Sequence, residues 1–516
     1  LRKINMRPFN SRNLFNLSHD VKLTCNMGKL VPFLCKEVIP GDSWRVSTDM
    51  VVRFMPLLAP VMHNVNVYTH YFFVPNRLIF DDWENFITGG EDGQDSTVEP
   101  TMVSPSGGYA ASSLADYLGF PIGVAGVTHS ALPFRAYAQI FNDYYRDENL
   151  QQEVAISKAA GSDTTTSTLL LTRAWQHDFF TSALPQQQRG PAVNLPLGNS
   201  APVVYGEAES GINLQYPWTG ALGSQSGNPA YSRADSSDIS VSLTSKGGTG
   251  TSNSGYPLLA DLSNATAADI NDLRYAFQVQ RFLERNMRNG VRYIEMILSH
   301  FAVKSSDARL QRAEYLGGGK SSVMFDEVLQ TSADDNQPTP LATMAGRGIS
   351  AQRSHKFRRF FEEHGFIIGI MSIMPRSTYS QGMSKMWNRP NRYSYYWPVF
   401  SHLGEQAIYN KELYTQGTSA DDGIFGYQPR YQEYRKAYGR VAGEFHVNKS
   451  LAFWHFGRRF SNLPTLSSDF IECNPTTDPF AVTDEIPDKI LVNMYVNAKV
   501  IRPIPKYGTP GYIDHD

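Results

Sequence analysis

The chain has 516 residues, of which 41% are hydrophobic, 12% aromatic and 19% charged, and its formal net charge is −2. This balance excludes a histone-like polycation, so any contact with nucleic acid must come from local clusters of basic residues. The three cysteines, Cys25, Cys35 and Cys473, are too few and too scattered for a disulfide framework or a zinc site. We expect reduced, packed thiols and no cofactor.

The length alone would suggest about three domains, but all-β folds often form one long unit with insertions. We therefore expect a single elaborated domain over residues 1–516. No segment approaches the roughly 18 consecutive apolar residues that span a bilayer, and the first residues do not resemble a signal peptide. These features predict a soluble protein that is made in the cytoplasm and has no membrane partner.

Residues 1–20 form a basic N-terminal arm. Arg2, Lys3, Arg7 and Arg12 all precede the first acidic residue, Asp20. Such an arm can reach packaged nucleic acid and bind its phosphates, or it can lie ordered on a neighbouring subunit. Both interpretations remain open at this stage.

Several segments have the composition and alternation of β-strands. Residues 65–74 alternate between two faces, and both faces become aromatic before Pro75, which predicts a strand that ends buried on both sides. Residues 491–501 place apolar side chains opposite polar ones. Similar segments rich in β-branched and aromatic residues predict strands at 46–54, 291–301 and 366–375. The pattern favours a β-sandwich or barrel with long connections.

Two helices are also predicted. Pro133 opens the first helix, whose apolar stripe includes Phe134, Tyr137 and Phe141. The second helix runs from Thr266 to the Asn289-Gly290 stop signal. One of its faces carries Leu273, Ala276, Val279, Leu283 and Met287, and the opposite face carries Arg274, Arg281, Arg285 and Arg288. These arginines form either a solvated face or a stripe that binds phosphates or a neighbour's carboxylates.

The segment between the two helices is polar. From 221 to 256, 21 of 36 residues are Gly, Ser, Thr or Asn, which cannot bury enough apolar surface to fold alone. Within it Ile239, Val241 and Leu243 alternate with Ser and Thr, as in a short strand. An interdomain linker is one interpretation. We favour a surface projection, because strand and helix patterns of similar composition continue on both sides, and residues 89–130 form a smaller insertion of this kind.

Basic and aromatic residues are interleaved in residues 426–440. Tyr431, Tyr434 and Tyr438 recur at near-helical spacing beside Arg430 and Arg435. Such a segment can stack on bases and bind phosphates, or it can hold subunits together.

Catalytic signatures are missing from the sequence. Residues 316–322, LGGGKSS, lack the glycine spacing of a phosphate-binding loop, and no His pair has the spacing of a metalloprotease. The adjacent carboxylates Glu362-Glu363 and Asp421-Asp422 would point apart in a strand, unlike a glycosidase pair. We therefore expect a protein that is not an enzyme.

Six long segments carry a resemblance to a known family. They are FFVPNRLIFDDWENF (72–86) and the segments at 30–44, 271–301, 307–319, 374–383 and 502–515. Together they resemble the major capsid protein of the Microviridae, which are small single-stranded-DNA bacteriophages, and specifically its gokushovirus branch.

The resemblance implies a mainly β fold: an eight-stranded antiparallel jelly roll with long insertion loops and a few helices. It implies self-assembly into a small T=1 icosahedral shell around a single-stranded DNA genome, with minor internal virion proteins and a host surface receptor as further partners. Residues 186–256 would form the variable surface projection, and the glycines at 317–319 a turn. The protein would belong to the virion and be made in the bacterial host cytoplasm. The resemblance supplies no catalytic residues.

Two other classes of protein are compatible with the strand pattern. A secreted carbohydrate-binding or carbohydrate-cleaving β-sandwich would be a stable monomer with aromatic side chains along a sugar groove. A fibre subunit would form open polymers.

Overall fold

A computed structural model describes residues 12–91, 94–191, 193, 203–205, 258–260, 270–289, 292–331, 341–353, 356–482 and 488–506. The chain divides into two compact units, Leu1–Arg189 with Leu283–Asp516, and Gly190–Phe282. The predicted projection at 186–256 falls almost wholly in the second unit, and most of it lies outside the described residues.

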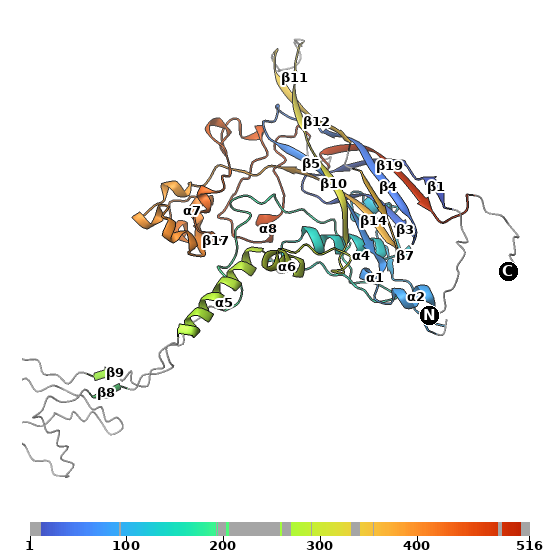
Figure 1. Cartoon of the computed structure of the whole chain (residues 1–516). Helices are drawn as coiled ribbons and strands as arrows, with labels where there is room; N and C mark the ends of the chain where they lie inside the picture. Colours follow the sequence, from blue (N-terminus) through green and yellow to red (C-terminus); the bar gives the residue numbers. More distant parts are fainter. Residues whose placement is uncertain are drawn as a thin grey trace, which may run out of the picture. The chain divides into compact units, whose positions relative to one another are not determined.

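Two antiparallel sheets dominate the first unit (Figure 1). The first sheet contains β1 (Asn13–Asn16), β2 (His19–Cys25), β4 (Ser43–Phe54), β11 (Met324–Leu329), β12 (Met344–Arg353), β13 (Phe357–Phe360) and β19 (Ile490–Arg502). The second sheet contains β3 (Val31–Val38), β5 (Val65–Pro75), β10 (Glu314–Ser322) and β14 (Gly365–Pro375). The strands predicted at 46–54, 65–74, 366–375 and 491–501 are therefore confirmed.

The strand pairing has the nested order of a jelly roll. β2 pairs with β19 and β4 with β12 in the first sheet, while β3 pairs with β14 and β5 with β10 in the second. These four antiparallel pairs alternate between the sheets, as in a long hairpin wrapped around a core. β1 and β2 lie end to end along β19, and β12 and β13 lie end to end along β4. The antiparallel fold is confirmed, whereas the number eight depends on joining these interrupted strands and stays a prediction.

The main hydrophobic core lies between the two sheets. β19 buries Val492, Met494, Val496, Ala498 and Val500, as its alternation predicts. The opposing strands contribute Trp44 from β4 and Tyr71 from β5, which are both fully buried. Each fully buried large apolar side chain contributes about 1.5–3 kcal/mol before entropy is considered.

The second sheet is covered on its other face as well. All eleven residues of β14 are buried. The covering helix α4 (Leu132–Ile140) begins with Pro133 near its N-terminus and continues as a π-helical turn, Phe141–Tyr145. Figure 1 shows α4 beside the β5/β14 strands, and Phe134 and Tyr137 pack with Phe72 of β5 in one cluster. By contrast, alternate residues of β4 and β19 in the first sheet face outward and are exposed or partly exposed.

Insertions between the long strands carry the remaining elements. The other helices are α1 (Asn76–Ile79), α2 (Trp83–Thr88), α3 (Leu114–Leu118), α5 (Ile270–Asn289), α6 (Tyr293–Phe301), α7 (Asn410–Leu413) and α8 (Ser468–Ile471). The short paired strands are β6 (Thr101–Val103) with β7 (Thr128–Ser130), β8 (Val203–Tyr205) with β9 (Leu258–Ala260), β15 (Thr378–Tyr379) with β18 (Gly439–Arg440), and β16 (Glu405–Tyr409) with β17 (Ile424–Pro429). No described helix has the length and apolar character required to cross a bilayer.

The strand predicted at 291–301 is wrong, because Tyr293–Phe301 form helix α6. Short apolar runs cannot be assigned to helix or strand by periodicity alone, and this run contains the helix formers Glu295, Met296 and Leu298. Glu295 lies in the first turn beside Arg292, and the helix ends at Ala302 in a left-handed conformation.

The turn predicted at glycines 317–319 is also wrong, because these residues lie inside strand β10. A register shift between Tyr315 and Gly317 marks a β-bulge against β5. A Cβ atom on Gly318 would lie 2.4 Å from the carbonyl oxygen of Thr69. The glycine thus allows a close approach of two strands.

Candidate interaction surfaces

The described residues contain no constellation suited to metal binding. No group of three His, Cys, Asp or Glu side chains there could hold a metal ion. Cys25, Cys35 and Cys473 are free thiols, which agrees with the expected reduced state. Burial raises the pKa of the Cys35 thiol to about 12, and burial also raises the pKa values of Cys25 and Cys473. The raised pKa values keep all three thiols protonated at neutral pH.

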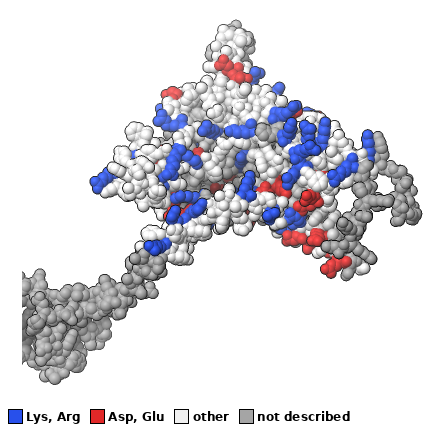
Figure 2. Space-filling model, in the orientation of Figure 1, with Lys and Arg blue, Asp and Glu red and all other residues white. Residues whose placement is uncertain are grey.

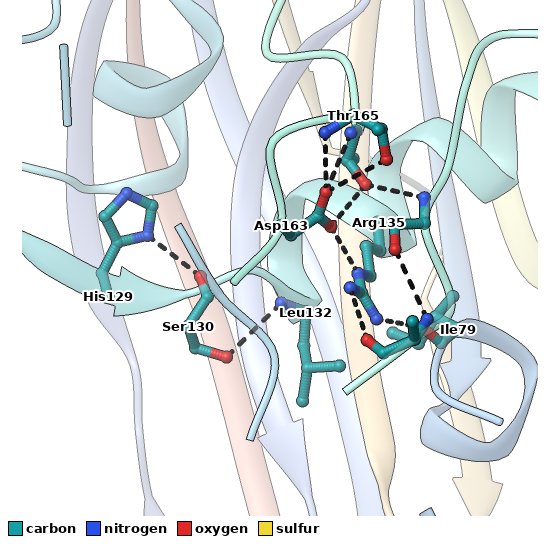
Figure 3. Close-up of polar contacts among 10 residues, drawn as sticks. Ile79, His129, Ser130, Leu132, Arg135, Asp163 and Thr165 are labelled. Atoms are coloured by element: carbon teal, nitrogen blue, oxygen red, sulfur yellow. Dashed lines mark hydrogen bonds and ion pairs between the residues drawn. The ribbon is translucent and has the colours of Figure 1, made fainter. Parts of the chain in front are cut away.

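Among the described ion pairs, the most completely buried one joins helix α4 to two other segments of the chain. Figure 3 shows Arg135 of α4 pointing toward Asp163, with 2.8 Å between Nε and Oδ2, and toward the carbonyl oxygen of Ile79 at 3.0 Å. Both charged side chains are completely buried. Burial opposes ionisation of Asp163, but hydrogen bonds from Thr166 and Arg135 outweigh it and hold the pKa of this carboxyl below its usual value. The pair connects three segments and leaves no group free for chemistry.

Helix α5 separates its apolar and basic faces as predicted. Met287 is buried and the other four residues of the predicted apolar face are partly buried, whereas Arg274, Arg281, Arg285 and Arg288 are exposed. Arg288 forms an ion pair with Glu405, and Arg285 donates to the carbonyl oxygen of Ser299. At least two of the four arginines therefore have partners within their own subunit.

The predicted basic and aromatic segment at 426–440 is not helical. It contains the end of β17, a 3-10 turn at Gln432–Tyr434 and β18. Tyr431 has a left-handed backbone and a ring that is only 1% exposed, and its hydroxyl donates to the carbonyl oxygen of Tyr395. Its ring is therefore not available to stack on a base.

The neighbours of Tyr431 remain accessible. Tyr434 is 56% exposed and Arg435 is also exposed. Arg430 lies over the Tyr431 ring at 4.9 Å and donates to the carbonyl oxygen of Tyr393. The segment thus presents one tyrosine and basic side chains at the surface.

A larger exposed surface lies beside it and was missed in the sequence. We define the aromatic platform as Trp387, Tyr393, Tyr395, Tyr396, Trp397 and Tyr434, each of which is 47–71% exposed. Arg389 lies over the rings of Tyr395 and Tyr434, at 5.2 and 5.0 Å, and its charge is paired with Glu433. The sequence signal that could have revealed this surface is the local concentration of aromatic residues, because five of the nine residues at 392–400 are aromatic.

The remaining predicted site residues lie mostly outside the described residues. This applies to Arg2, Lys3 and Arg7 of the basic arm and to Ile239, Val241 and Leu243 of the projection strand. Arg12 is described, is exposed and lies over the ring of Phe360 at 5.4 Å.

Comparisons with known proteins agree with this jelly roll. The family model of the phage capsid protein (F protein) matches residues 7–512. Capsid protein VP1 of Bdellovibrio phage phiMH2K is 39% identical, and VP1 of Chlamydia phage 1 is 37% identical. VP1 of Spiroplasma virus 4 is 32% identical. Each comparison covers 97% of this chain and 95% of the relative.

The fold and these matches define a structural protein of a phage shell. The chain belongs to the phage capsid protein (F protein) family, which confirms the resemblance to the Microviridae. It is a capsid protein rather than an enzyme, so the carbohydrate-active sandwich and the fibre subunit are set aside. Its place is the virion, where copies assemble into the shell.

Proposed function

We propose that this major capsid protein builds a small T=1 icosahedral shell around a single-stranded DNA genome. The observation that carries the proposal is the family match over residues 7–512 on a two-sheet jelly roll. Closed symmetry uses the same surfaces on every copy and leaves no free edge for further growth. Many modest contacts can then stabilise the particle, although each one is weak.

The aromatic platform is our candidate for a contact between copies. Aromatic residues and arginine are enriched at the buried centres of protein interfaces. Its six rings lie at residues 387–397 and at 434, where exposed aromatic side chains are concentrated beside the exposed cations Arg392 and Arg435, while the charge of Arg389 is already paired. A surface of this kind is unfavourable in water and favourable against a second copy.

Further partners belong to the same proposal. The basic arm with Arg2, Lys3, Arg7 and Arg12 would contact packaged DNA, and minor virion proteins would be enclosed with it. The insertion at 186–256 would reach the host receptor. The subunit would be made in the cytoplasm of the bacterial host.

The nucleic acid inside purified particles tests the genome assignment. Particles from infected cells should protect a nucleic acid from added nuclease. After extraction, a nuclease specific for single-stranded DNA should digest it, while ribonuclease should not. Protected RNA or double-stranded DNA would overturn the assignment.

A further inference from the structure

The outer face of the first sheet contains a row of three cations at opposed positions. Arg45 of β4 lies directly opposite Lys499 of β19 on one side and Arg358 of β13 on the other. We call these three residues the cation row. All three are exposed, while Trp44 and Val46, the neighbours of Arg45 along β4, are buried in the core.

No acidic side chain compensates the cation row within the part of the chain that the structure describes. None of its three side chains forms an ion pair or hydrogen bond there, whereas Arg347, Arg353 and Arg359 on β12 and β13 each pair with a carboxylate. The adjacent cross-strand pair, Asn497 with Ser47, is uncharged.

Like charges directly opposite each other destabilise a sheet, because their side chains lie about 5 Å apart. Three unpaired cations in line therefore lower the stability of the isolated subunit. Figure 2 shows Lys and Arg gathered over the region where Figure 1 places β4 and β19. The arrangement becomes favourable when one ligand supplies several negative charges in a line.

We propose that the cation row binds the phosphate backbone of packaged single-stranded DNA. The inference rests on the proposed function and assigns a DNA site to residues of the sheet itself. The phosphates of a flexible single strand can align with a row of cations that lie about 5 Å apart. Individual carboxylates fixed on a folded neighbouring subunit match such a row less readily.

One adjacent feature supports a nucleic-acid occupant. Arg12, the first described residue of the basic arm, lies over Phe360, two residues after Arg358. The arm therefore joins the sheet beside the row.

The test compares two triple variants of the full-length protein. The first, R45Q/R358Q/K499Q, neutralises the cation row. The matched control, R347Q/R353Q/R359Q, removes the same charge from arginines that already have carboxylate partners. Binding to a fluorescent single-stranded oligothymidylate is measured over a series of salt concentrations.

Each phosphate contact on a single strand contributes about 0.7 to the slope of log K against log salt. Neutralising the cation row should therefore reduce the slope by about 2, and the control should change it by much less. The row variant should keep at least the wild-type midpoint in urea, because repulsion is removed.

Equal slopes for the row variant and the wild type would overturn the inference. So would loss of particles with an unchanged slope, because that result assigns the row to a contact between subunits. If wild-type particles contain no single-stranded DNA, the proposed function fails instead.

Discussion

Arg135 and Asp163 join three segments of the subunit through one buried ion pair. Replacing Arg135 with Met would leave the Asp163 charge buried without its cation, at a cost of about 3–5 kcal/mol in the free energy of unfolding. Urea unfolding of dissociated subunits measures this loss. In the control R353M the lost pair with Asp49 is exposed and screened by solvent, so the loss in the free energy of unfolding should be much smaller. Equal losses in the two variants would contradict this account.

Two partly buried histidines predict a dependence of stability on pH. Burial lowers the pKa of His70 to about 4, with a further contribution from Arg173, and burial also lowers the pKa of His63 to about 4. The unfolded chain binds these protons near pH 6.5, so the free energy of unfolding should fall as the pH drops from about 6.5 to about 4. In urea unfolding of the H70Q variant over this pH range, the free energy of unfolding should fall less than it does in the wild type. The same pH dependence as in the wild type would contradict the assignment.

At the scale of elements, the aromatic platform predicts an assembly defect. Replacing Trp387 and Tyr395 with Ser removes two exposed rings from a contact that every copy repeats, and each such ring can contribute about 2 kcal/mol. Sedimentation should show fewer particles, with the subunit's urea midpoint unchanged. L169S, which alters an equally exposed apolar residue elsewhere, is the control. If the variant instead gave normal yields of particles that lack DNA, the aromatic platform would be a contact with the genome rather than a contact between subunits.

The β8/β9 pair offers a way to test host attachment. Tyr205 lies directly opposite Leu258, so an Asn-Gly turn can join these strands in place of residues 206–257. We expect the shortened protein to assemble into particles that no longer adsorb to host cells. Adsorption of these particles at the wild-type rate would exclude this insertion as the attachment site.

The sequence predicted long strands better than surfaces. The alternation in β19 and the aromatic end of β5 identify core strands, because burial on a sheet face imposes a period of two. Residues 293–301 do not lie on a buried sheet face, and none of the residues of α6 is fully buried. Their apolar composition alone therefore led to the wrong prediction of a strand. Tyr431 and Tyr434 are equivalent in the sequence, but a left-handed backbone at Tyr431 turns one ring inward and leaves the other exposed.

The cation row was not visible in the sequence either. Arg45, Arg358 and Lys499 are far apart along the chain, and only the strand register brings them into line. A net charge of −2 conceals this local excess of positive charge.

At the scale of the whole molecule, we expect the exposed surfaces of this jelly roll to be buried only by contacts with other copies of the same chain. Electron microscopy of particles assembled from the purified full-length protein tests it most directly. The account predicts closed particles of one diameter with icosahedral symmetry, in which the aromatic platform lies at a contact between subunits. Dispersed monomers or open filaments under assembly conditions would contradict it.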